Sequence, residues 1–302
     1  MKKNNDYQNF ANLTDNEARA MLEKIRWPEG AVCPHCGAID PYKLTPKASS
    51  KSGVREGVYK CSACRKQFTV TVGTIFEGSK VKLGKWLAVI HLACSSKKGI
   101  SAHQIHRMFG ITYKTAWFMM HRIRFAMSAP DGQVFSGIVE ADETYVGGKG
   151  KGKRGRGSVK KTPVFSLLER DGSVKSKVVE HVTAKNLQSA IYESVDRNSI
   201  ICTDEFKSYK GLDKGFKAHK VVNHSIEQYV DGIAYTNSVE GFFSILKRGI
   251  NGIYQHVSKH HLQNYLSEFD FRYNHRKISD AERTFEALKG FEGKRLLYKA
   301  LA

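Results

Sequence analysis

Three acidic residues in separate segments of the chain have types and settings suited to metal chemistry. Asp142 lies in IVEADETYVGGK, Asp204 in SIICTDEFKSY and Glu240 in YTNSVEGFFSILKRG. The first two end apolar, β-branched runs that are typical of strands, whereas Glu240 opens a helical pattern. Carboxylates are the hard oxygen ligands that Mg²⁺ prefers, and a site built from three of them leaves positions open for substrate phosphate and water. We therefore expect these residues to bind divalent metal together.

The charge of the chain indicates the class of partner. Its 302 residues include 49 Lys and Arg against 29 Asp and Glu, which gives a net charge of +20. Neutralising the phosphates of a polyanion releases condensed counterions, so such an excess favours nucleic acid. The N-terminus lacks the apolar stretch of a signal peptide, and no run of about 18 apolar residues indicates a membrane span. We expect a cytoplasmic protein with no membrane partner.

Four cysteines form two matched pairs near the N-terminus. Cys33 and Cys36 make one Cys-x-x-Cys, and Cys61 and Cys64 make the other after 24 intervening residues. Two such turns can present four thiolates tetrahedrally, as structural Zn²⁺ requires. A redox pair or buried free thiols would not explain two matched pairs. We therefore predict a first domain over 14–80, in which a helix with a Thr14-x-x-Glu17 capping box precedes a zinc ribbon.

The segment 81–130 is predicted to be helical. SAHQIHRMF and YKTAWFMMHRIR, joined by Gly110-Ile111-Thr112, have the proportions of a helix-turn-helix. The second helix presents Tyr113, Lys114, Arg122 and Arg124 for DNA, while Trp117, Met120 and Ile123 are spaced to pack inward. A helical linker or a dimer surface is the alternative interpretation of this module.

The third domain is expected over 135–290, as an α/β domain with a mixed sheet. The pattern predicts the order β-β-β-α-β-α-β-α, with three antiparallel strands followed by crossover units. Between the first two strands, residues 147–161 interleave seven basic residues with six glycines. We expect this tip to contact DNA phosphates through Lys151, Lys153, Arg154 and Arg156, although a solvated loop would have the same composition.

Other carboxylates compete with the three candidates. Glu140 shares the strand face of Asp142 by alternation, and Glu143 and Glu205 are immediate neighbours of the candidates. Asn237 precedes Glu240 by three residues, in the spacing of a capping box. A purely structural role for Glu240 is therefore an alternative to metal binding.

Nearly the whole chain resembles a known family through these motifs. WPEGAVCPHCG…YKCSACRKQFTVTVGTIFEGSK, VEADETYVGGKGKGKRGRG, TDEFKSY and YTNSVEGFFSILKRGINGIYQHVSKHHLQNYLSEFDFRYNHR together resemble a DDE transposase of bacterial insertion sequences, in the ISXO-type branch with an N-terminal zinc ribbon. The resemblance implies a ribonuclease-H-like catalytic domain in which the strands of Asp142 and Asp204 are neighbours. It further implies that Asp142, Asp204 and Glu240 bind two Mg²⁺ or Mn²⁺ ions, with Asp142 bridging them. Lys247 matches the basic residue that follows the glutamate in many such enzymes, and Arg248 stands next to it.

The expected function is therefore transposition. The protein would bind double-stranded DNA at the terminal inverted repeats of its element and at the target, as a homodimer or larger assembly, and catalyse strand cleavage and strand transfer. One alternative is a zinc-ribbon DNA-binding regulator with an inactive ribonuclease-H-like core. A nuclease of the same fold, which cuts DNA without joining it, is another.

Overall fold

The computed structural model describes residues 6–45, 56–129, 132–148, 161–222 and 235–301. They divide into two compact units. The first comprises the described residues of Met1–Ser96, Ala102–Met127 and Ile278–Ala302, and the second those of Lys97–Ser101 and Ser128–Lys277. None of the helices in the described part of the chain combines the length and the apolar character needed to cross a membrane.

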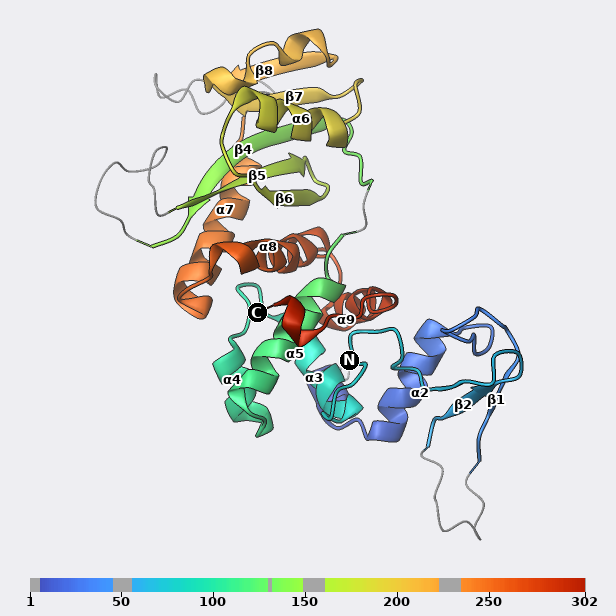
Figure 1. Cartoon of the computed structure of the whole chain (residues 1–302). Helices are drawn as coiled ribbons and strands as arrows, with labels where there is room; N and C mark the ends of the chain where they lie inside the picture. Colours follow the sequence, from blue (N-terminus) through green and yellow to red (C-terminus); the bar gives the residue numbers. More distant parts are fainter. Residues whose placement is uncertain (1–5, 46–55, 130–131, 149–160, 223–234, 302) are drawn as a thin grey trace, which may run out of the picture. The chain divides into compact units, whose positions relative to one another are not determined.

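A five-stranded sheet forms the centre of the second unit (Figure 1). Its strands are β4 (Ile138–Val146), β5 (Thr162–Glu169), β6 (Val174–Val178), β7 (Ile200–Asp204) and β8 (Ala218–Val222). They lie in the order β6-β5-β4-β7-β8. β4, β5 and β6 are antiparallel, whereas β7 runs parallel to β4 and β8 runs parallel to β7. This order confirms the predicted mixed sheet and is that of the ribonuclease-H-like fold.

Helices cover both faces of this sheet. One core joins α6 (Ala184–Ser194) to Val139 and Ala141 of β4. The other core packs α7 (Asn237–Gly249) and α8 (Lys259–Asn274) against Val146 of β4 and residues of β5. Because successive side chains of a strand point to opposite faces, Glu140 and Asp142 belong to the α7 face.

The connection between β7 and β8 differs from the prediction. A helix was expected there, but the described chain has only two short 3₁₀ turns, η1 (Lys207–Tyr209) and η2 (Leu212–Lys214). Gly211 separates them in the left-handed region at φ +92°. A residue in that conformation ends a right-handed helix, so the segment makes compact turns that bury Tyr209 and Leu212.

The N-terminal half of the first unit contains the expected capped helix and ribbon. α1 (Asp6–Ala11) is followed by α2 (Asp15–Arg26), and the predicted capping box is present, since the N–H of Glu17 donates to Thr14 Oγ1 at 3.3 Å. Three short antiparallel strands follow, namely β1 (Pro41–Lys43), β2 (Tyr59–Cys61) and β3 (Gln67–Phe68). The ring of Trp27 packs edge-on against Tyr59 and Phe68, which gives the ribbon a small aromatic core.

The remainder of the first unit is helical. It contains α3 (Leu83–Ser95), α4 (Ala102–Phe109), α5 (Tyr113–Ala126) and, from the far end of the sequence, α9 (Asp280–Lys289). The sequence placed residues up to 290 in the catalytic domain, but α9 packs here. His91 Nδ1 of α3 lies 2.9 Å from Thr284 Oγ1, and Arg283 Nη1 donates to the carbonyl of Cys94 at 3.0 Å. The apolar face of α9, on which Leu288 is fully buried, therefore completes the core of the first unit.

Candidate active site and zinc centre

The strand register brings Asp142 and Asp204 to the same level of the sheet. β4 and β7 pair in parallel with Ile138 opposite Ile200 and Glu140 opposite Cys202. This offset of 62 residues is also the separation of Asp142 from Asp204. Neighbouring strands are about 4.8 Å apart, and residues at one level share a face. Both carboxylates therefore lie side by side where β7 ends.

Helix α7 is tied to the same strand through Glu140, which is 0% exposed. Glu140 Oε2 accepts the N–H groups of Ser238 and Val239, each at 3.0 Å, in the first turn of α7. Its other oxygen accepts Arg170 Nε at 2.9 Å, and Arg170 Nη2 donates to the carbonyl of Tyr235 at 2.9 Å. Both oxygens of Glu140 are thus engaged in holding the helix. This favours Asp142 over Glu140 as the metal ligand.

Glu240 stands in the first turn of that anchored helix. The helix begins at Asn237, so the N-cap is Thr236 and the expected capping by Asn237 is wrong. No N-cap side chain accepts a helix N–H here, because the Glu140 carboxylate takes two of them instead. Thr236 Oγ1 donates to Glu240 Oε1 at 3.0 Å, and Glu240 remains exposed.

The charges of Asp204 and Glu240 both act on Asp142. Burial raises the pKa of Asp142 well above its usual range, and the negative charges of Glu143, Asp204 and Glu240 raise it further. Glu143 points to the opposite face of β4, where Tyr209 Oη donates to its Oε2 at 2.8 Å. Like charges held together disfavour ionisation, and a divalent cation relieves that repulsion. The donor set therefore fits Mg²⁺ or Mn²⁺.

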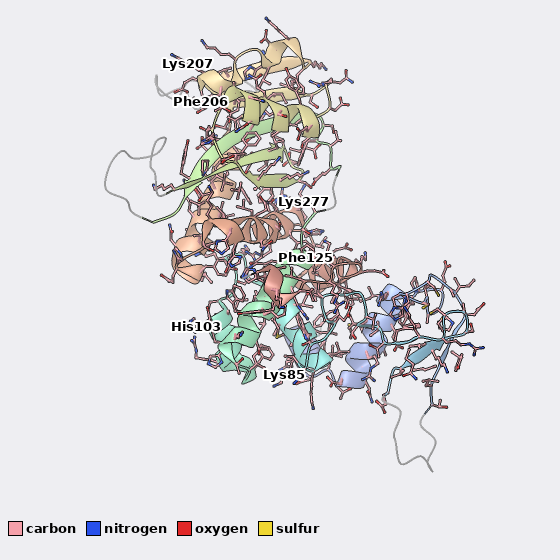
Figure 2. All side chains as sticks on the ribbon, in the orientation of Figure 1. Lys85, His103, Phe125, Phe206, Lys207 and Lys277 are labelled. Carbon is pink, nitrogen blue, oxygen red and sulfur yellow. The ribbon has the colours of Figure 1, made fainter. Side chains whose placement is uncertain are left out.

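The backbone after β7 fixes the side chain of Asp204. Phe206 and Lys207 follow the end of the strand, where both are labelled in Figure 2. The N–H of Phe206 donates to Asp204 Oδ1 at 3.0 Å, and Phe206 itself packs against the core under α6. The carboxylate is thus oriented by a local turn whose aromatic residue is half-buried.

The predicted basic residues of α7 lie further along the same helix. Lys247 and Arg248 are both exposed. Lys247 lines a cavity of about 220 Å³ with Tyr145 of β4, Lys161 and Asn251. The two lysines give this cavity a positive charge next to the end of the strand that carries Asp142. The predicted contacts Lys151, Lys153, Arg154 and Arg156 lie outside the described residues.

The four cysteines of the ribbon form a compact cluster. Their sulfur atoms all lie within 4.8 Å of one another, with Cys33 and Cys64 at 3.7 Å and Cys36 and Cys61 at 3.6 Å. A tetrahedral Zn²⁺ with Zn–S bonds of about 2.3 Å requires sulfur separations of about 3.8 Å. The N–H of Cys64 donates to the Cys61 sulfur at 3.4 Å, and such bonds lower the pKa of Cys61 to about 7. The cluster fits a structural zinc ion.

α4 and α5 are the two predicted helices joined by a short turn, but the basic residues of α5 differ in exposure. Gly110 adopts φ +61° in the turn, and Thr112 caps α5 by accepting the N–H of Thr115 at 3.2 Å. Lys114 is exposed, as expected for a DNA contact. Arg122 is only 7% exposed, and its Nη1 donates to the carbonyls of Ile75 and Glu77.

The participation of Glu140 and Arg170 was not anticipated from the sequence. Alternation had placed Glu140 beside Asp142, yet no local signal indicated that Arg170 and the start of α7 would be its partners. Its partners Ser238 and Val239 lie 98 and 99 residues away along the chain. A glutamate inside an apolar strand was the available signal, since such a residue is buried only when it is paired.

Comparison with known proteins agrees with this geometry. Residues 134–274 match the model of the ISXO2-like transposase domain, and residues 13–67 match that of the transposase zinc-ribbon domain. A Halobacterium salinarum protein described as an uncharacterized protein in transposable element ISH50 is 29% identical over 285 residues, or 86% of this chain and 91% of that protein. An uncharacterized transposase-like protein of Haemophilus influenzae is 33% identical over 101 residues, or 33% of this chain and 80% of that protein.

These matches cover both the acidic site and the cysteine cluster, and the topology agrees with the expected catalytic fold. The chain therefore belongs to the family of ISXO2-like transposases, with a zinc ribbon and a ribonuclease-H-like transposase domain.

Proposed function

We propose that this protein cleaves DNA strands at the ends of its insertion sequence and joins them to target DNA. The observation that carries the proposal is the placement of the three carboxylates: the register of β4 and β7 puts Asp142 and Asp204 at one level of the sheet, and Glu140 holds the first turn of α7, which bears Glu240, to the same strand. Strand cleavage and strand transfer are both displacements at phosphorus, which need positioning and charge stabilisation more than a protein nucleophile.

Each part of the site has a separate task in this proposal. Asp142, Asp204 and Glu240 hold two Mg²⁺ or Mn²⁺ ions, which when bound activate the attacking hydroxyl group and stabilise the leaving oxygen. All three carboxylates would supply the oxygen ligands that these ions prefer. Glu140 and Arg170 hold α7 so that Glu240 faces the two aspartates. Lys247 and Arg248 contact the phosphates of the bound DNA end.

Recognition of DNA is assigned to basic residues outside the acidic site. Lys114, at the start of α5, contacts the terminal inverted repeat. The phosphates of the DNA backbone are contacted by four further basic residues, Lys151, Lys153, Arg154 and Arg156. The net charge of +20 supports a polyanionic partner. Because two element ends react together, the working form is a homodimer or larger assembly on DNA in the cytoplasm. Arg122 is not assigned a contact with paired DNA, since backbone carbonyls already bind its Nη1.

The test uses the purified full-length protein and the DNA that flanks its own gene. With Mg²⁺ or Mn²⁺ we expect nicks at fixed positions, and Asp204→Ala should abolish them without weakening DNA binding. Glu205→Gln is the matched control, because this neighbouring carboxylate is exposed and is not assigned to the site. Joined products containing target DNA would separate a transposase from a nuclease that only cuts. Specific binding with no cleavage by any metal would contradict the proposal and favour a regulator.

A further inference from the structure

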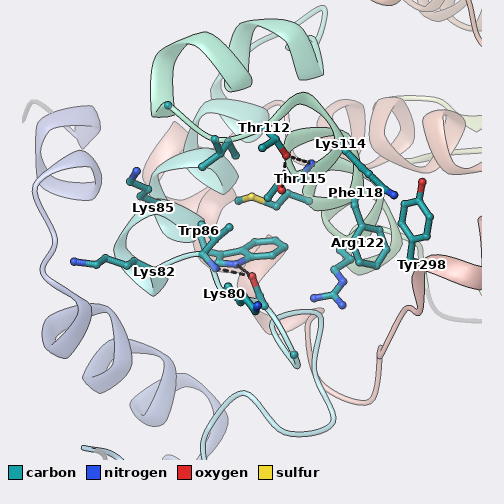
Figure 3. A pocket seen from close by; sticks show the side chains of 16 residues that line it. Lys80, Lys82, Lys85, Trp86, Thr112, Lys114, Thr115, Phe118, Arg122 and Tyr298 are labelled. Atoms are coloured by element: carbon teal, nitrogen blue, oxygen red, sulfur yellow. Dashed lines mark hydrogen bonds between the residues drawn. The ribbon is translucent and has the colours of Figure 1, made fainter.

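A cavity of about 810 Å³ lies entirely within the first unit, beside the turn between α4 and α5 (Figure 3). It is formed by the loop 78–82, the start of α3, the turn Gly110 to Thr112, the first turns of α5 and the side chain of Tyr298. Its volume is in the range of pockets that enclose a small organic ligand. Neither the proposed DNA cleavage nor the zinc cluster accounts for it.

The charged groups of this cavity all have the same sign. Its cations are Lys80, Lys82, Lys85, Lys114 and Arg122, and no acidic residue is among the described residues that line it. Arg122 Nε is buried and finds no hydrogen-bond partner in the described part of the chain. Burial lowers the pKa of Arg122, and the nearby charge of Arg295 lowers it further, while the charge of Glu77, which is paired with Arg295, opposes the shift. An anionic group would satisfy this donor and relieve the repulsion.

Aromatic rings supply the remaining walls. The indole of Trp86 lines the buried base of the cavity and is itself 1% exposed, and in Figure 3 Phe118 and Tyr298 lie on one side of it. Trp86 Nε1 donates to Ser79 Oγ at 3.0 Å, which fixes the ring. Phe118 and Tyr298 meet edge to face at 5.4 Å, and the Arg122 guanidinium lies 4.3 Å from the Phe118 centroid. Fixed rings beside cations suit a flat, electron-rich group that carries negative charge.

A nucleotide has both a negatively charged phosphate and a flat aromatic base, and the DNA that this protein is proposed to bind contains nucleotides. We propose that the cavity takes one nucleotide displaced from the duplex at the element end, with its base against the aromatic rings and its phosphate at the cations. The inference rests on the proposed binding of the element end by Lys114 of α5. Lys114 belongs both to the proposed DNA contact and to the cavity, since it lies in the first turn of α5 and its Nζ is 4.6 Å from the Tyr298 ring centroid. Base–aromatic stacking offsets part of the cost of unpairing a base.

The experiment measures the affinity of the full-length protein for end DNA without divalent metal, so that no cleavage interferes. A single mismatch is moved along the duplex one position at a time. At the displaced nucleotide the mismatch removes the cost of unpairing, so binding should tighten by about 10-fold, while other positions show no gain. Tyr298→Ala and Lys80→Ala should each abolish the gain. Both side chains are exposed, so the fold should survive.

Lys24→Ala is the matched control, because it removes an equal charge from an exposed position of the same unit outside the cavity. It should keep the gain at the mismatch. Binding of paired DNA with no gain at any position would overturn this inference and leave the proposed function standing, whereas failure to bind end DNA at all would overturn both. A gain that persists in Tyr298→Ala would also overturn it. So would saturable binding of free dAMP together with no gain in DNA, since the cavity would then serve a free nucleotide.

Discussion

Two residues in equivalent positions of the zinc ribbon adopt left-handed backbone conformations, although only one is a glycine. Gly37 follows Cys36 at φ +77°, and Arg65 follows Cys64 at φ +61°. Their N–H groups donate in the same way, Gly37 to the carbonyl of Cys33 at 2.9 Å and Arg65 to that of Cys61 at 3.1 Å. Both Cys-x-x-Cys turns therefore need this conformation to direct their sulfur atoms. In the second turn Arg65 adopts it despite the steric cost of its Cβ atom.

We predict that Gly37→Ala weakens the ribbon and that Arg65→Gly does not. A Cβ at Gly37 would meet no atom within 4 Å, so the cost is that of the backbone conformation alone, about 1 kcal/mol. Competition for Zn²⁺ with a coloured chelator would measure it, with several-fold weaker zinc retention expected for Gly37→Ala. Equal retention of zinc by Gly37→Ala and the wild-type protein would show that the Cys33–Cys36 turn tolerates another backbone conformation.

Asp270 is a buried carboxyl group whose ionisation is linked to folding of the second unit. It lies on α8, where its Oδ1 accepts Ser176 Oγ and its Oδ2 accepts the Ser176 N–H, each at 2.7 Å. Burial raises the pKa of Asp270 to about 7, even though the bonds from Ser176 oppose the rise. The folded state therefore binds a proton that the unfolded chain releases near pH 4.

The sign of the pH dependence follows from that difference. Because the folded state holds the extra proton, this contribution to stability is complete below about pH 4 and is lost as the pH rises to about 7. A shift of three pKa units corresponds to at most about 4 kcal/mol. We predict that amides of β6 and α8 exchange hydrogen faster at pH 8 than at pH 5, after correction for intrinsic rates. Asp270→Asn, which cannot ionise, should flatten this trend, and an unchanged trend would remove Asp270 as its cause.

At the scale of elements, the position of α7 depends on one buried ion pair. Glu140 joins β4 to the first turn of α7, and Arg170, the residue after β5, binds the chain just before that helix. The guanidinium of Arg170 also lies 3.3 Å from the centroid of the Tyr235 ring. A carboxylate at a helix N-terminus is further stabilised by the helix dipole. These contacts connect the strand of Asp142 to the helix of Glu240 without using either acidic side chain.

We therefore predict that Glu140→Gln impairs catalysis more than DNA binding. The change leaves Arg170 without its buried partner, and a displacement of Glu240 by about 1 Å is enough to slow a positioned reaction by about 100-fold. The metal concentration for half-maximal cleavage should rise, which a general loss of folded protein would not cause. Glu193→Gln, an exposed carboxylate of α6, is the control. Cleavage with the metal requirement of the wild-type protein would contradict the anchoring role.

Features that depend on nearby residues were predictable from the sequence, while those that depend on distant partners were not. The Thr14–Glu17 capping box and the turn at Gly110 each span a few residues, and both are present. Hydrophobic patterning predicted the succession of strands along the chain, while the pairing of β4 with β7 was implied by the family resemblance. In contrast, helical spacing could not show that Arg122 turns toward Ile75 and Glu77, 47 and 45 residues earlier. The 3₁₀ turns after β7 also reflect tertiary packing, since they bury Tyr209 against the α6 core.

At the scale of the whole molecule, the two units differ in what holds them together. The sheet of the second unit has an apolar core on each face. The ribbon of the first unit has strands of three, three and two residues, too few to bury much apolar surface. A domain of this size needs a metal ion to offset its loss of chain entropy. Loss of zinc should therefore affect the ribbon selectively.

We predict that a zinc-selective chelator unfolds the ribbon while the catalytic sheet stays folded. Trp27 is 7% exposed, so release of the ribbon should shift its fluorescence to longer wavelength. Hydrogen exchange should accelerate in β2 and stay slow in β4, because the second unit has its own cores. Cys36→Ser should reproduce the effect without chelator, whereas Cys94→Ala, a buried cysteine of α3 outside the cluster, should leave β2 protected. Equal acceleration in β2 and β4 would show that the cysteine cluster stabilises both units together.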